Sequence, residues 1–156
     1  MGWTTFTGAR GTRGIYLNKG AKLDLDHVYA SEFDVRYEQP GAIIYANDSN
    51  IITIKSSKLY NSHGFFGGAI AITNGELDMI DTDNHDNQSD SNSGAVKLVG
   101  STAYITNGRI YDNIARKEGG GIALWDSTIT LNGKMNKEIS CLNPIYFFFP
   151  KVTHNS

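Results

Sequence analysis

Four short segments of this chain have the same form and recur at nearly constant spacing. Each begins with small residues and continues as an apolar strand, and the four begin at Gly41, Gly68, Gly94 and Gly120, in steps of 27, 26 and 26 residues. A weaker copy lies at residues 13–18. A nearly constant period of this length indicates supersecondary units that stack on one another and share one continuous core.

The residues inside each unit favour β-strands over helices. A turn rich in Asn, Asp, Gly and Ser follows the opening strand, and a second strand with strict alternation follows the turn. These second strands are centred on residues 23–25, 52–54, 77–79, 103–105 and 129–131. A short third segment then leads to the next unit. The sequence therefore predicts an all-β fold, a parallel β-helix (solenoid) of about five coils with 26–28 residues per coil.

Stacking the coils in register places equivalent residues in columns, with about 4.8 Å between coils. The first strand is predicted to turn two columns inward: Ile15, Ile43, Ile70, Val96 and Ile122, and Leu17, Tyr45, Ile72, Leu98 and Leu124. The second strand is predicted to add Leu23, Ile52, Leu77, Ala103 and Ile129, and Leu25, Ile54, Met79, Ile105 and Leu131. Like residues stack on like, as a solenoid core requires.

The outward positions of the first strand form a flat face of small and apolar residues. Its main members are predicted to be Tyr16, Ile44, Ala71, Val99 and Trp125. An exposed apolar surface of this kind usually marks a contact with another molecule. Two interpretations stay open: a face for interaction, or a face that the N-terminal or C-terminal segment covers.

A short polar residue stands seven positions before each of the four repeated small residues. These residues are Asp34, Asn61, Asn87 and Asn113. Amide side chains one coil apart can hydrogen-bond to each other and to bent backbone. We therefore expect the four to form a turn ladder, and a structural role is favoured over a binding role.

Charge and hydropathy exclude two kinds of partner. The net charge is −2 and 19% of the residues are charged, so the chain lacks the basic stripe that nucleic acid requires. The longest apolar run, residues 145–150, is too short to span a bilayer. Neither nucleic acid nor a membrane span is therefore expected.

The repeat resembles that of chlamydial polymorphic outer-membrane proteins and related β-helix adhesins, which carry a GGAI element preceded by F-x-x-N. Here GGAI stands at residues 67–70, and residues 110–113 (IYDN) approximate the second element. The resemblance covers residues 13–133 and implies a right-handed parallel β-helix of the pectin-lyase-like type. That fold hosts both adhesins and enzymes, so the resemblance leaves the function open.

No arrangement of residues predicts a cofactor or a convincing catalytic site. Asp24 and Asp78 share an outward column of the second strand, about 9.6 Å apart by two strand spacings, near the upper end for an inverting glycosidase pair. A solvated sheet face is the favoured interpretation. Asp81, Asp83 and Asp86 offer oxygen ligands for Ca²⁺, but the stretch lacks the known calcium-loop patterns, which favours a solvated turn. The histidines share no spacing, so no other metal is expected.

Three features lie outside the repeat pattern. The sequon at residues 47–49 makes Asn47 a candidate for N-glycosylation in an exposed turn. Residues 1–12 are predicted as an N-terminal strand or cap before the coils, and the repeat ends at residue 133. The non-repeat tail, 134–156, is expected to form a cap or a strand that pairs with a neighbouring subunit, although a wrongly assigned gene end is a third interpretation. Its apolar strand comprises Ile145, Tyr146, Phe147, Phe148 and Phe149.

Two functions from different classes fit these observations. The first is a non-enzymatic, extracellular or cell-surface protein of structural or adhesive role, which self-associates through coil ends, the flat face or the tail. Contacts that do not close would make it a filament subunit. The alternative is a carbohydrate-binding or polysaccharide-cleaving protein of the pectin-lyase-like kind, with surface glycans as ligands. The outward face of the first strands carries no carboxylate, and glycoside cleavage needs a pair of them, so binding is favoured over cleavage.

Overall fold

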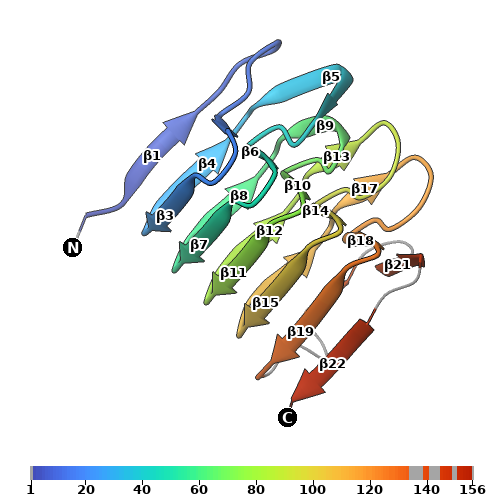
Figure 1. Ribbon diagram of the computed structural model, residues 1–156. Coiled ribbons are helices and arrows are strands. Elements are labelled where there is room, and N and C mark those ends of the chain that lie inside the picture. Colours follow the sequence, from blue (N-terminus) through green and yellow to red (C-terminus); the bar gives the residue numbers. More distant parts are fainter. Residues whose placement is uncertain (1, 134–138, 141–144, 149–150, 156) are drawn as a thin grey trace.

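A computed structural model of the chain describes residues 2–133, 139–140, 145–148 and 151–155. The strands run parallel and stack as a β-solenoid of about five turns, and the two termini lie at opposite ends of the stack (Figure 1). The described part of the chain contains no helix, and therefore none that could cross a membrane. The predicted all-β solenoid is confirmed.

Equivalent strands of successive coils form four parallel sheets. The first sheet contains β2 (Ile15–Leu17), β6 (Ile44–Asn47), β10 (Ile70–Thr73), β14 (Val96–Val99), β18 (Ile122–Trp125) and β21 (Ile145–Phe148). The second contains β3 (Lys22–Asp26), β7 (Ile51–Lys55), β11 (Glu76–Ile80), β15 (Thr102–Thr106), β19 (Thr128–Asn132) and β22 (Lys151–Asn155).

The third segment of each coil is two strands rather than one. They form a third sheet of β1 (Thr4–Thr7), β4 (Val28–Ser31), β8 (Lys58–Tyr60), β12 (Asp83–His85), β16 (Arg109–Tyr111) and β20 (Ile139–Ser140). A fourth sheet contains β5 (Asp34–Pro40), β9 (His63–Phe66), β13 (Gln88–Ser89) and β17 (Ile114–Ala115). A complete coil therefore has four sides.

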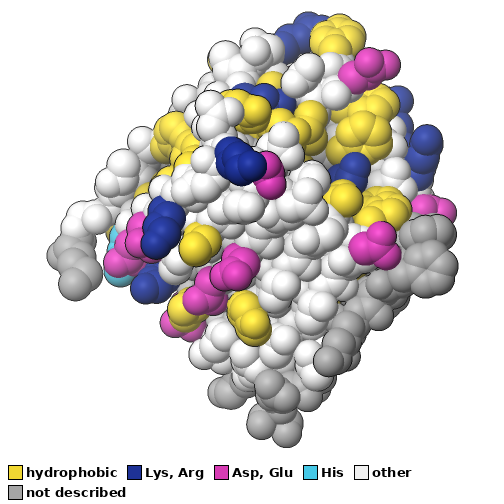
Figure 2. Space-filling view, in the orientation of Figure 1, with side chains coloured by type: hydrophobic (Ala, Val, Ile, Leu, Met, Phe, Trp, Pro, Cys, Tyr) yellow, Lys and Arg dark blue, Asp and Glu magenta, His cyan; other side chains and the backbone are white. Residues whose placement is uncertain are grey.

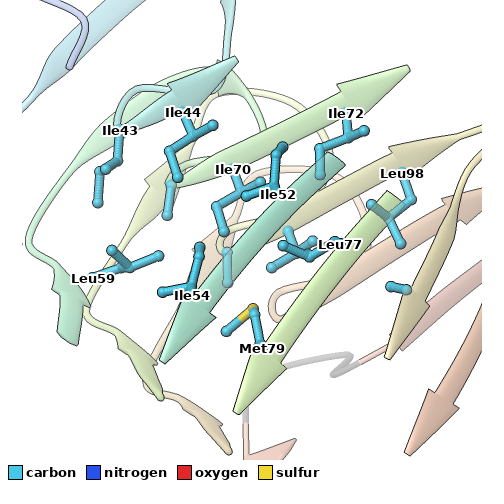
Figure 3. Packing of buried hydrophobic residues seen from close by; sticks show 14 of the residues in the cluster. Ile43, Ile44, Ile52, Ile54, Leu59, Ile70, Ile72, Leu77, Met79 and Leu98 are labelled. Carbon is cyan, nitrogen blue, oxygen red and sulfur yellow. The ribbon is translucent and has the colours of Figure 1, made fainter. Parts of the chain in front are cut away.

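The register of the second sheet agrees with the predicted columns at every coil. Leu23 pairs with Ile52, and the column continues through Leu77, Ala103 and Ile129. Figure 3 shows this wall of the core facing the first sheet, with the side chains of Ile52, Ile54, Leu77 and Met79 among those that fill the interior. Strict alternation over five residues fixes the register, because a slip of one residue would expose the whole apolar set.

The predicted register of the first sheet is wrong by one residue in the second coil. Ile44, not Ile43, pairs with Ile70, and Ala46 pairs with Ile72. The reason lies in the preceding corner. Gly41 has the same left-handed backbone as Gly67, with φ of 56° and 66°, so these two are equivalent and the step is 26 residues.

The left-handed corner column continues at the same spacing through Ser93 and Gly119, with φ of 66° and 65°. Glycine adopts this conformation without a steric penalty. The repeated small residue at Gly68, Gly94 and Gly120 therefore stands one position after the corner residue. Aligning Gly41 with Gly68 gave the apparent step of 27.

Buried polar side chains join one coil to the next at the corners between sheets. The Asn87 amide oxygen accepts a hydrogen bond from the backbone N–H of Ser62 (3.0 Å), and the Asn113 oxygen accepts one from that of Asn87 (2.9 Å). Ser127 and Ser101 make the same contact at another corner (3.0 Å). Each satisfies a backbone donor that the bend leaves without a strand partner.

Two residues of the predicted turn ladder are not part of it. Asn61 is exposed and has φ of 50°, so it occupies the left-handed position before the ladder, where Asp86 and Asp112 stand in later coils. Asp34 lies in β5 and pairs with His63 of β9. The hydrogen-bonding column is Ser62, Asn87 and Asn113, because a longer first coil and a 25-residue step shift the early positions.

The ends of the stack differ from each other. At the N-terminal end β1 pairs with β4, and the Phe6 ring lies 4.8 Å from that of Phe33 against the core. At the other end β20, β21 and β22 pair in parallel with β16, β18 and β19 of the same chain. The described part of the tail thus continues three sheets, whereas Phe149 lies outside the described residues. Pairing of the tail with a neighbouring subunit stays a prediction.

Candidate functional site

The outer surface of the first sheet is aromatic and basic rather than uniformly apolar. One outward column contains Tyr16, Tyr45, Ala71, Lys97 and Ala123, and the next contains Asn47, Thr73, Val99 and Trp125. We call this surface the aromatic–basic face and include Arg13 and Phe66, which contact it. Ile44 was predicted here and is wrong: its side chain is fully buried inside, because of the one-residue register error.

Lys97 lies at the centre of the aromatic–basic face between two aromatic rings. Its Nζ is 3.9 Å from the ring centroid of Phe66 and 5.1 Å from that of Trp125. Ala71 and Ala123 flank it on the neighbouring strands and are themselves covered, although both side chains point outward. Cation–π contacts of this kind stabilise the ammonium group, while burial lowers the pKa of Lys97.

No carboxylate of the described residues forms an ion pair with Lys97. A half-buried ammonium group loses hydration, and aromatic rings replace only part of it. The Lys97 side chain therefore carries a positive charge that this part of the chain does not neutralise. An anionic group from another molecule would complete the site.

A second cation, Arg13, lies at the N-terminal end of the face. The Arg13 guanidinium carbon is 5.1 Å from the ring centroid of Tyr45 and 5.9 Å from that of Tyr16, and these two rings are 5.3 Å apart. Arg13 also donates a hydrogen bond to the carbonyl of Pro40 (2.9 Å), which fixes its position. The aromatic–basic face thus holds two positioned cations and, along its strands, no acidic residue.

The second sheet has the opposite charge. The outward positions of β3, β7 and β11 carry four carboxylates and two ammonium groups: Asp24, Asp26, Glu76 and Asp78, with Lys22 and Lys55. Figure 2 shows acidic side chains gathered over this sheet. Asp24 and Asp78 are in one column with Thr53 between them, as the sequence predicted.

A charged cluster on the fourth sheet was not predicted from the sequence. Asp90 Oδ1 lies 3.1 Å from His63 Nε2 and 3.2 Å from Arg116 Nε. Beside it is a hollow of about 270 Å³ lined in part by Arg10, Asp34 and His63. Phe65, Asp90 and Arg116 are 25 and 26 residues apart, so the period places them in one column. The repeat spacing could therefore have predicted the contact between Asp90 and Arg116.

The His63–Asp90 contact has the distance of an ion pair but not the direction of a hydrogen bond. His63 Nε2 is buried and has no hydrogen-bond partner among the described residues. A general base needs an aligned hydrogen bond to fix its tautomer, and the direction of this contact does not provide one. The cluster therefore fits charge pairing between coils better than proton transfer.

The predicted calcium candidates do not converge. Asp83 forms a two-pronged ion pair with Arg109, and Asp86 Oδ2 lies 2.7 Å from His85 Nδ1. The His85 ring is itself stacked between two tyrosines of neighbouring coils. Asp81 occupies a left-handed corner. Among the residues that the structure describes, no three acidic, histidine or cysteine side chains could hold a metal ion.

The remaining predicted positions are split between surface and interior. Asn47 ends β6 and is exposed, as a glycosylation acceptor must be. Asn87 also begins a sequon, but its side chain is fully buried. Residues 145–148 form the backbone of β21 beside β18.

The chain matches no known protein family, no curated protein and no solved structure.

Replacing Lys97 with methionine is expected to change how stability depends on pH. Because burial lowers the pKa of Lys97 in the folded state, the unfolded chain binds more protons between that lowered value and the ordinary value of 10.5. Wild-type stability should therefore rise relative to Lys97→Met as pH increases through this range. Urea denaturation of both proteins at several alkaline pH values measures the difference, and a difference that falls with pH would contradict the assignment.

Proposed function

We propose that this protein is a non-enzymatic β-solenoid of structural or adhesive role at the cell surface, which self-associates through its aromatic–basic face. The observation that carries the proposal is Lys97, a half-buried cation held between Phe66 and Trp125 without a carboxylate partner in the described chain. Aromatic residues and arginine are enriched in protein interfaces, where they anchor binding.

The geometry of the N-terminal end favours a side-by-side contact over end-to-end stacking. There the edge strand β3 carries Lys22, Asp24 and Asp26, and charged edge strands discourage pairing with another chain. Phe6 and Phe33 also cover part of the open core. A filament built through the coil ends is therefore the less favoured version of this proposal.

Replacing Trp125 with alanine is expected to weaken self-association by about tenfold or more, since a truncated aromatic anchor commonly costs over 1 kcal/mol of binding. Sedimentation equilibrium of wild type and variant over a range of concentrations measures the change. Tyr37→Ala is the matched control, because Tyr37 is 81% exposed and lies on the fourth sheet. Equal association of Trp125→Ala and wild type would exclude the aromatic–basic face.

Carbohydrate binding is a second candidate, favoured by the exposed rings of the same face. Tyr16 is 51% exposed and adjoins the Tyr45 ring and the Arg13 guanidinium. Aromatic rings with neighbouring polar groups suit recognition of a sugar, which has one apolar side and many hydroxyls. A screen of neutral and acidic polysaccharides, for both binding and cleavage, tests this candidate; retention that survives Tyr16→Ala would place any binding elsewhere.

A further inference from the structure

The acidic second sheet offers the charges that the aromatic–basic face lacks. Asp24 is exposed and Asp78 half-buried, and neither forms an ion pair within the described residues. Asp26, by contrast, lies 2.7 Å from His27 Nδ1. Lys22 and Lys55 stand in the two outer columns of the sheet, so the central column has no cation.

Each surface carries two like charges that are separated along the direction in which the coils stack. Asp24 and Asp78 are two strands apart in one column, with Thr53 between them, a separation of about 9.6 Å. On the aromatic–basic face, the Arg13 guanidinium lies over Tyr45, which is two strands from Lys97 in one column. On each surface the two like charges therefore lie in different coils, so two cations can face two carboxylates at once.

From this match we infer that the partner of the aromatic–basic face is the second sheet of another copy of this chain, with Lys97 and Arg13 facing Asp78 and Asp24. The inference rests on the self-association proposed above. The contact joins two different surfaces, so a pair of copies keeps one free surface of each kind and assembly can continue sideways. Complementary charge at such a contact sets register and orientation.

Charge reversal on each surface, followed by mixing, tests this pairing. Lys97→Glu alone and Asp78→Lys alone should each weaken self-association of the full chain at least tenfold, because like charges then face each other. An equimolar mixture should associate again, since Lys97 of the Asp78→Lys chain can meet Asp78 of the Lys97→Glu chain. Lys117→Glu makes the same charge change at an exposed position on another part of the surface and should leave association unchanged.

Sedimentation at low and high salt, with circular dichroism to establish folding of each variant, separates the outcomes. Association that weakens with salt, falls in both variants and returns on mixing supports the pairing. Loss in Lys97→Glu but not in Asp78→Lys would overturn the second sheet as partner and leave self-association standing. A wild type that is monomeric at every concentration would overturn the proposed self-association itself. If that monomer is retained on an acidic polysaccharide, the result would favour carbohydrate binding as the role of the aromatic–basic face.

Discussion

Replacing Asn87 with alanine is expected to lower the free energy of unfolding by about 4 kcal/mol, which is a large part of the stability of a single domain. The Asn87 oxygen accepts the buried Ser62 N–H, and its Nδ2 donates to the carbonyls of Leu59 (3.0 Å) and His85 (2.9 Å) and to Asn84 Oδ1 (2.8 Å). Alanine leaves the Ser62 N–H without this acceptor and removes the Asn87 donor from the Leu59 carbonyl and from Asn84 Oδ1, whereas the His85 carbonyl still accepts the backbone N–H of Asn61. Each buried unsatisfied group costs about 1–3 kcal/mol.

Urea denaturation of wild type and variant measures the loss. Asn61→Gly is the matched control, because Asn61 stands at the corresponding corner of the preceding coil but is exposed, with φ of 50°. Glycine suits that backbone, so the control should change stability by no more than about 0.5 kcal/mol. Comparable losses in both variants would mean that the ladder contributes no more than the corner conformation.

The register of the second sheet could be predicted residue by residue because inward apolar residues alternate with outward residues along its strands. Five alternating residues such as Lys22–Asp26 (KLDLD) allow one register only. This alternation is absent where β6 of the first sheet begins, because Ile43 and Ile44 are consecutive and both fully buried. There the register is set by the left-handed corner at Gly41, and the identity of a residue does not reveal its φ.

The fourth side of each coil was missed for a related reason. β13 and β17 are two residues long, and β5 is irregular between Val35 and Pro40, so no alternation is visible. Side chains that meet across a corner were also hidden. Phe66 is the last residue of β9, and its ring covers Lys97 of β14, which is 31 positions later in the chain.

The aromatic character of the aromatic–basic face depended on the same one-residue error. With Ile44 outward, Lys97 was the one charged residue of an otherwise small, apolar or uncharged face, and Tyr45 was assigned to the core. The observed register exchanges these two residues. The exchange places Tyr45 beside Tyr16 and under Arg13, which adds an aromatic ring and a second cation to this face.

Replacing Gly68 with alanine is expected to lower the free energy of unfolding by about 3 kcal/mol or more, because the backbone of the next coil lies close to this residue. A Cβ at Gly68 would overlap the carbonyl oxygens of Gly94 and Gln88, both backbone atoms that cannot rotate away. The same close approach recurs one coil later, where a Cβ at Gly94 would overlap the Gly120 carbonyl. The small residue in each repeat is therefore required by contact between coils.

The effect of Gly68→Ala can be separated from the general cost of replacing a glycine. Gly20 has φ of 73° and open space where a Cβ would lie, so Gly20→Ala should cost about 1 kcal/mol from backbone conformation alone. Ala42 occupies the position equivalent to Gly68 in the preceding coil, where the irregular strand β5 interrupts the regular pairing. Thermal and urea unfolding should rank Gly68→Ala well below Gly20→Ala; the reverse order would show that the coils can separate locally at little cost.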